Sequence, residues 1–146
     1  SNLVGVKECS GNVRMGYYVS KGIACWSGID DQCFEGRHRN QSHGVISVIA
    51  NLLPGLMRKL MDEDNSELNQ RLQPLMAWLF HVPSPNALNT AMAMTGAAPP
   101  VFRLPYAPLD SNARQEGFQL LNAFSDEERV GNTLKLMDDS EFELSC

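Results

Sequence analysis

The chain has 146 residues and a formal net charge of −5, with 43% hydrophobic and 20% charged residues. This length suits a domain of ordinary size, and this balance excludes a disordered or fibrous chain. Because the basic residues are scattered and the net charge is acidic, a nucleic acid partner is disfavoured. No apolar run approaches the roughly 20 residues of a membrane span, so we expect no membrane partner either.

The cysteines and histidines show no metal-binding spacing. None of the four cysteines forms a C-x-x-C pair, and the three histidines are not spaced as metal ligands. We therefore predict free thiols in a reducing compartment, with no metal and no cofactor. These residues are Cys9, Cys25, Cys33 and Cys146, with His38, His43 and His81.

The first predicted element is a short apolar strand, residues 3–9, that carries Lys7 near its end. The run is too short for a helix and is typical of a buried parallel strand. Two interpretations of Lys7 are open. Most lysines are exposed, so Lys7 would simply end an edge strand and point into solvent. Alternatively, burial would remove the ammonium from water and free the amine as a nucleophile toward carbonyl groups.

A regular step follows along the first third of the chain. Lys7, Ser27 and Ser47 each lie in or close an apolar run, at intervals of 20 residues. The runs 22–26 and 44–48 are typical of strands covered on both faces. Between the runs, residues 12–20 and 31–40 suit helices, with Asn12 and Asp30 as N-caps. This alternation predicts parallel strands joined by right-handed crossovers.

From residue 51 the pattern becomes helical. We predict a helix capped by Asn51 that runs to about residue 62, with Pro54 in its first turns. The next helix, residues 67–80, carries an apolar stripe and is expected to bend at Pro74. The stripe consists of Leu68, Leu72, Leu75, Met76 and Leu79.

The last third begins with a small-residue helix capped by Asn86 and ended near Gly96. Residues 98–108 hold four prolines and are expected to form an extended connector. An amphipathic helix over residues 111–124 would then bury Phe118, Leu121 and Phe124. In the acidic segment 125–146, Phe142 and Leu144 alternate like an edge strand or a docking tail.

Four segments resemble dihydrodipicolinate synthase in its plant and algal form. They are Gly5–Asn12 (GVKECSGN), Trp26–Cys33 (WSGIDDQC), Gly44–Val48 (GVISV) and Phe102–Tyr106 (FRLPY), in the order of that family. The resemblance covers nearly all of this chain but only the second half of the family's chain. It implies an α/β fold: the C-terminal part of a TIM barrel, with about three parallel strands and their helices, followed by an all-helical C-terminal region.

The resemblance also implies a domain division and a site. Residues 1–63 would hold the last three strand–helix units of the barrel, and residues 64–146 a helical domain with an acidic tail. Lys7 would form an imine with pyruvate. Gly28 and Ile46 match the family's pyruvate pocket. All three positions fall at the carboxyl ends of predicted strands, which form the active face of a parallel barrel.

The remaining polar candidates are assigned to structure. Asp30 and Asp31 stand where a helix is predicted to begin, so we interpret them as charges favoured by the helix dipole rather than as a catalytic pair. The family's proton-transfer tyrosines and threonine, and the arginine that holds the aldehyde substrate, belong to the half that this chain does not match. Tyr17, Tyr18 and Tyr106 are therefore expected to be packing residues.

One segment departs from the family pattern. Gln41 stands where the family has a glycine that ends a helix, next to His38 and Asn40. Either this helix ends differently or this surface has changed. The usual packing and assembly are therefore in doubt here, although the three strands are not.

Two hypotheses about function follow. The first is an enzyme, a lyase that condenses pyruvate with aspartate semialdehyde in lysine biosynthesis. Its missing strands would come from other polypeptide, and the lone chain would be inactive. The second is a non-catalytic relative that acts as a self-associating or regulatory module. An open set of parallel strands favours association, as a homo-oligomer or with a chain that supplies the missing half.

The resemblance to plant members also implies a location in the chloroplast stroma. We find no transit-peptide pattern at the start of this sequence, and the cytoplasm is the expected location otherwise.

Overall fold

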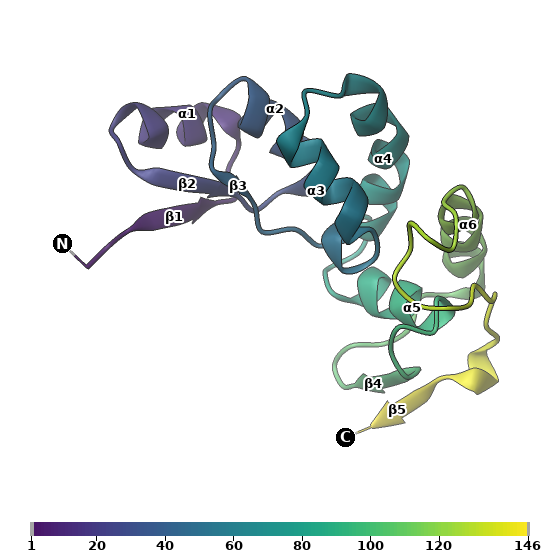
Figure 1. Cartoon of the computed structure of the whole chain (residues 1–146). Coiled ribbons are helices and arrows are strands. Elements are labelled where there is room, and N and C mark those ends of the chain that lie inside the picture. Colours follow the sequence, from purple (N-terminus) through teal and green to yellow (C-terminus); the bar gives the residue numbers. More distant parts are fainter. Residues whose placement is uncertain (1, 146) are drawn as a thin grey trace. The chain divides into compact units, whose positions relative to one another are not determined.

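The computed structural model describes residues 2–145, which form two compact units (Figure 1). The first unit contains the residues up to Val48 together with Leu56–Gln73, and the second contains Ile49–Gly55 together with the residues from Pro74 onward. Each unit thus combines segments that are separated in the sequence. The predicted single boundary between residues 63 and 64 falls inside the first unit.

The first unit contains a three-stranded parallel sheet in the order β1-β2-β3 (Figure 1). These strands are β1 (Gly5–Glu8), β2 (Ala24–Ser27) and β3 (Gly44–Val45). In the register, Lys7 lies opposite Trp26 and Trp26 lies opposite Gly44. The predicted alternation of parallel strands and helices is confirmed, although the strands are shorter than the apolar runs.

Two helices cover one face of this sheet, as Figure 1 shows: α1 (Asn12–Ser20) and α2 (Cys33–His38). Under them, Cys25 and Ser27 are fully buried. Registered partners in parallel strands share a face, so Lys7 and Trp26 lie on the opposite face. Within the described residues of this unit, no helix covers that second face. The prediction of strands covered on both faces is therefore wrong for this unit.

The predicted caps of the first two helices are also corrected. Gly11 is the N-cap of α1, with φ 119°, and Asn12 is the first helical residue. A short 3-10 turn, Asp30–Gln32, precedes α2. Asp30 does not cap α2, because its Oδ2 atom accepts the Val48 backbone N–H at 2.9 Å. Its carboxylate thus holds the loop after β3 instead of a helix end.

The helix α2 ends through a left-handed residue even though no glycine is present. Gln41 has φ 58°. Around it, the Asn40 N–H donates to the Glu35 carbonyl at 3.1 Å and the Ser42 N–H to the Gly36 carbonyl at 2.9 Å. The glutamine therefore occupies the conformation that glycine adopts at lower cost.

Two longer helices follow, α3 (Pro54–Asp62) and α4 (Ser66–Leu79). A 3-10 turn, Ile49–Asn51, precedes α3, so Pro54 rather than Asn51 stands at the helix start. The Asn65 side chain caps α4 by accepting the Leu68 N–H at 2.9 Å. The predicted apolar stripe of α4 is buried, which confirms its helical period. Pro74 lies inside this helix, as predicted.

The second unit contains α5 (Asn86–Met94), α6 (Ser111–Asn122) and two short strands. The strands β4 (Val101–Arg103) and β5 (Glu143–Ser145) pair in parallel, with Phe102 opposite Leu144. The predicted edge strand near the C-terminus is confirmed. The C-terminal region is therefore helical with one added two-stranded sheet, because the proline-rich connector supplies a partner for the tail.

The helices of this unit begin and end close to the predicted residues. Pro85, not Asn86, is the N-cap of α5, and Gly96 follows its end with φ 69°, as expected of a glycine after a helix. The helix α6 ends at Asn122, two residues earlier than predicted. Leu121 in the helix and Phe124 just after it are buried as predicted, whereas Phe118 is only half-buried.

The periodicity did not reveal two buried positions of α6, Arg114 and Gly117. Arg114 donates to the Leu109 carbonyl and pairs with Asp139.

Among residues 2–145, no helix has the length and apolar character needed to cross a bilayer.

Candidate active site

The carboxyl ends of the three parallel strands are joined by backbone hydrogen bonds. The Gly28 N–H donates to the Glu8 carbonyl at 2.8 Å, and the Ile46 N–H donates to the Ser27 carbonyl at 2.8 Å. These bonds extend the ladder past the ends of β2 and β3. The three positions that the sequence singled out, Lys7, Gly28 and Ile46, thus lie on neighbouring strand ends.

The Lys7 side chain lies directly over Gly28. A methyl group built on residue 28 would stand 2.5 Å from Lys7 Cε and 3.1 Å from Lys7 Cγ. Real carbon atoms do not approach so closely, so any larger residue at position 28 would displace the lysine. Gly28 thus leaves the space that the Lys7 side chain occupies, and its backbone is not left-handed.

The exposure of Lys7 agrees with one of the two interpretations that the sequence left open. Lys7 is exposed on β1, which is an edge strand of the sheet. Its aliphatic stem nevertheless packs over Gly28, and this contact keeps the side chain at the strand ends. Ile46 follows β3 directly, and its side chain is 52% exposed.

Buried polar groups hold these strand ends in place. The Ser27 hydroxyl donates to the Ile29 carbonyl at 2.9 Å. Glu8 is buried next to Lys7 in the chain, and hydrogen bonds from Ser10 lower the pKa of its carboxyl. Asp30 binds the loop after β3. Ser27, Glu8 and Asp30 thus each form hydrogen bonds that hold the backbone near the strand ends. This supports the interpretation that Asp30 is not one of a catalytic pair.

The thiols differ in their surroundings. Cys9 is free and exposed, whereas Cys25 and Cys33 are free and buried. Burial raises the pKa of the Cys33 thiol to about 12, and the nearby Asp30 carboxylate adds to this shift. Cys146 lies outside the described residues. Within residues 2–145, no three side chains of His, Cys, Asp or Glu gather as a metal site would require.

Two of the three predicted packing tyrosines are exposed. Tyr17 is 58% exposed and Tyr106 is 44% exposed, so the prediction that they pack is wrong for both. Tyr18 is half-buried, and its ring lies 5.9 Å from that of Tyr17. The Lys21 ammonium stands 5.7 Å from the Tyr17 ring.

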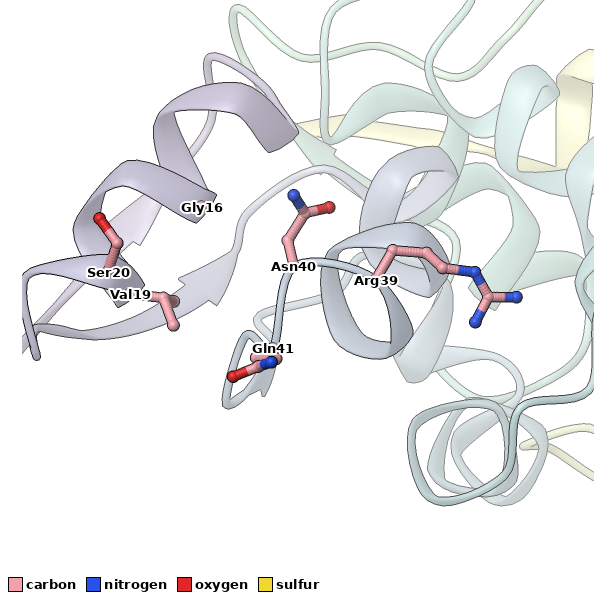
Figure 2. A pocket seen from close by; sticks show the side chains of 6 residues that line it. All are labelled: Gly16, Val19, Ser20, Arg39, Asn40 and Gln41. Atoms are coloured by element: carbon pink, nitrogen blue, oxygen red, sulfur yellow. The ribbon is translucent and has the colours of Figure 1, made fainter.

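A hollow of about 260 Å³ lies between α1 and the end of α2 (Figure 2). Asn40 extends between the two helices, while the Arg39 guanidinium points away and pairs with Asp64 at 2.7 Å. Sequence reasoning found no site here, although the departure at Gln41 marked this surface. The hollow is lined by Gly16, Val19, Ser20, Arg39, Asn40 and Gln41.

Parallel strands in sequence order, the first two each followed by a helix on the same face, define this protein as part of a TIM-barrel fold. The sequence model of the dihydrodipicolinate synthetase family matches residues 1–124. The chain belongs to this family.

Relatives of known name agree with this assignment. The chain is 52% identical over 143 residues to 4-hydroxy-tetrahydrodipicolinate synthase 1, chloroplastic, of Arabidopsis thaliana, covering 97% of this chain and 39% of the relative. It is 47% identical over 146 residues to the chloroplastic enzyme of Zea mays, covering 99% of this chain and 38% of the relative. The chain therefore spans about two fifths of the length of the curated relatives it matches.

Solved structures show the same fold. The 4-hydroxy-tetrahydrodipicolinate synthase of Methylacidiphilum fumariolicum superposes with a TM-score of 0.73 at 30% identity, covering 84% of this chain and 44% of that chain. A chloride-inhibited dihydrodipicolinate synthase of Acinetobacter baumannii, complexed with pyruvate, gives a TM-score of 0.74 at 27% identity, covering 84% and 45%.

Proposed function

We propose that this chain carries the Schiff-base lysine of a dihydrodipicolinate synthase and that Lys7 forms an imine with pyruvate. The observation that carries this proposal is the Lys7 stem lying over Gly28 at the ends of three parallel strands. Family membership and a pyruvate complex of a related structure support it.

The chemistry requires only a free amine and a keto acid in its first stage. The Lys7 amine adds to the ketone carbon, water leaves, and an iminium ion forms. The iminium withdraws electrons, so the adjacent methyl carbon loses a proton and becomes an enamine nucleophile. In the complete protein, the enamine would attack aspartate semialdehyde in lysine biosynthesis. Proton transfer at these steps needs positioned acids and bases. We assign these to strands that the present chain does not contain.

The remaining strands of the barrel must come from other polypeptide, either more of the same chain or another chain. Three strands cannot close an eight-stranded barrel. The open edges of β1 and β3 are where the additional strands would pair, and the second face of the sheet is where they would pack. We therefore expect these 146 residues alone to associate and to show negligible condensation of pyruvate with aspartate semialdehyde.

The proposed location is the chloroplast. Plant relatives such as those of Arabidopsis thaliana and Nicotiana tabacum are named chloroplastic. A plant-type protein of this family would act where those relatives act.

Reductive trapping tests the imine. The chain is incubated with pyruvate and sodium borohydride, and intact and peptide masses are measured. We expect one stable adduct on Lys7, because borohydride reduces the iminium to a secondary amine that cannot revert. The Lys7→Arg variant keeps the charge and should lose the adduct.

Two further variants make the trapping result specific. Lys21→Arg changes an exposed lysine at the end of α1 and should leave the adduct on Lys7 in place. Gly28→Ala should lower the yield, because the added methyl group takes the space of the Lys7 stem. A folded chain without any adduct on Lys7 would remove the basis for the enzyme proposal.

The exposure of Lys7 favours a second candidate function. Lys7 is exposed, whereas a lysine nucleophile is activated by desolvation in an apolar pocket. In that case the chain would be a non-catalytic, self-associating module with Lys7 retained from its ancestry. This candidate predicts association without trapping, whereas the enzyme proposal predicts both.

A further inference from the structure

The Cys9 thiol lies beside the stem of Lys7. A methyl group on residue 28 would meet Cys9 Sγ and Lys7 Cε at once, with both atoms within 2.5 Å of it. One small space above Gly28 thus contains both a thiol and the side chain that carries the amine. Cys9 and Gly28 together confine the Lys7 stem.

The backbone on either side of Cys9 is held by hydrogen bonds. It directly follows β1, and the next residue, Ser10, donates its N–H to the buried Glu8 carboxylate. The Glu8 carbonyl in turn accepts the Gly28 N–H. The backbone on both sides of the contact is therefore fixed by hydrogen bonds.

Cys9 also differs from the buried cysteines in its access to solvent. Cys25 and Cys33 are buried, and burial raises the pKa of both thiols. The thiolate is the reactive form of cysteine, so these two are protected from thiol reagents. Cys9 is the exposed thiol among the described cysteines.

We propose that Cys9 is a positioning residue of the Lys7 site: its sulfur holds the Lys7 stem over Gly28, and enlarging that sulfur displaces the amine. This inference rests on the proposed function of Lys7. The space above Gly28 has no room for one more methyl group. A group added to the Cys9 sulfur is therefore expected to crowd the Lys7 stem on the side that faces Gly28. A low-molecular-weight disulfide would therefore switch the site off, and a reducing thiol would restore it.

Thiol–disulfide exchange modifies Cys9 and needs no reagent other than the disulfide itself. The Cys9 thiolate attacks one sulfur of the disulfide, whose S–S bond breaks as the new one forms. The leaving thiolate takes the electron pair of the broken bond. A reducing thiol reverses the modification by the same reaction at the mixed disulfide.

Methylthiolation tests the proposal in the chain with Cys146→Ser, so that modification at that residue does not interfere. The reagent is methyl methanethiosulfonate, from which Cys9 takes a methylthio group and methanesulfinate leaves. Peptide masses confirm the modified residue. We expect the yield of pyruvate adduct on Lys7 to fall at least about tenfold, because small misplacements of a reacting group are costly. Dithiothreitol should restore the yield.

Two variants separate positioning from a loss of folding. In Cys9→Ser, the yield of pyruvate adduct on Lys7 should be the same with and without the reagent. Cys9→Met places a side chain of nearly the same shape as methylthiolated cysteine. It should lower trapping without the reagent, and dithiothreitol should have no effect. Urea midpoints show whether each variant remains folded. If Cys9→Met is unfolded, the trapping yield of the methylthiolated protein still tests the proposal.

A second measurement keeps this inference distinct from the imine proposal. The rate at which an acetyl ester of N-hydroxysuccinimide acylates Lys7 is compared with the rate at Lys21, before and after modification of Cys9. A changed ratio supports displacement of the amine, whether or not pyruvate is trapped. Full modification of Cys9 with unchanged acylation and unchanged trapping would overturn the inference, and so would an unreactive Cys9.

Discussion

At the scale of single residues, the end of α2 accommodates Gln41 at a position where a glycine is expected. Gln41 adopts φ 58°, a left-handed conformation that costs a residue with a side chain about 1–2 kcal/mol. The turn around it is still closed by the hydrogen bond between the Ser42 N–H and the Gly36 carbonyl. The family's glycine can therefore be lost without losing the helix end.

The substitution Gln41→Gly should stabilise the chain. We expect the free energy of unfolding to rise by about 0.5–1 kcal/mol, because relief of left-handed strain exceeds the added entropy of the unfolded glycine. The urea midpoint measures this change. The matched control is Asn40→Gly, whose φ is not positive, and which should destabilise by about 0.5–1 kcal/mol. Equal effects of the two variants would exclude strain at Gln41 as the cause.

At the scale of elements, α4 and α6 of the second unit meet at a tryptophan and a glycine. The Trp78 indole N–H donates to the Ala113 carbonyl at 2.9 Å. A methyl group built on Gly117 would overlap the same indole ring. Gly117 is therefore kept small by helix packing. Leu121 in the same helix and Phe124 just beyond its end are also buried.

Gly117→Ala should accordingly destabilise the chain by about 1–3 kcal/mol through overpacking. The comparison is Gly55→Ala in α3, where nothing lies within 4 Å of the added methyl group. That variant should stabilise by about 0.5–1 kcal/mol, since alanine is the better helix former. Urea unfolding followed by tryptophan fluorescence and circular dichroism compares the two. A neutral Gly117→Ala would mean that Trp78 can shift at little cost.

At the scale of the whole molecule, the parallel sheet of the first unit is covered by helices on one face and has two edge strands, β1 and β3. Parallel sheets are normally covered on both faces. Leu3 and Val4, which lead into β1, are 65% and 84% exposed. An apolar edge of this kind is a site for pairing with further strands.

We therefore expect the isolated chain to associate through this edge. Its sedimentation coefficient should rise with protein concentration. Val4→Lys should weaken association, because a charge on an edge strand disfavours pairing. Val101→Lys changes the same residue type on β4 of the other unit and should have a smaller effect. A compact monomer at every concentration would contradict the proposed pairing.

The sequence by itself determined the order of strands and helices, the family, and the placement of Lys7, Gly28 and Ile46 at strand ends. The order of elements follows from the apolar period and the 20-residue step, which are local properties of the chain. The stripe of α4, the glycine after α5 and the edge strand near the C-terminus were predictable for the same reason. The family, and Gly28 and Ile46 as candidate residues, followed from the resemblance of four segments.

Only the tertiary structure decided which groups the polar side chains bind and how the strand ends pack. Asp30 binds the N–H of Val48, 18 residues away, and the Lys7 stem shares one space with Cys9 and Gly28. The pairing of β4 with β5 likewise joins segments about 40 residues apart, so neither strand could be assigned a partner from its own sequence. Contacts between distant segments depend on the positions of whole elements, and local patterns do not contain that information.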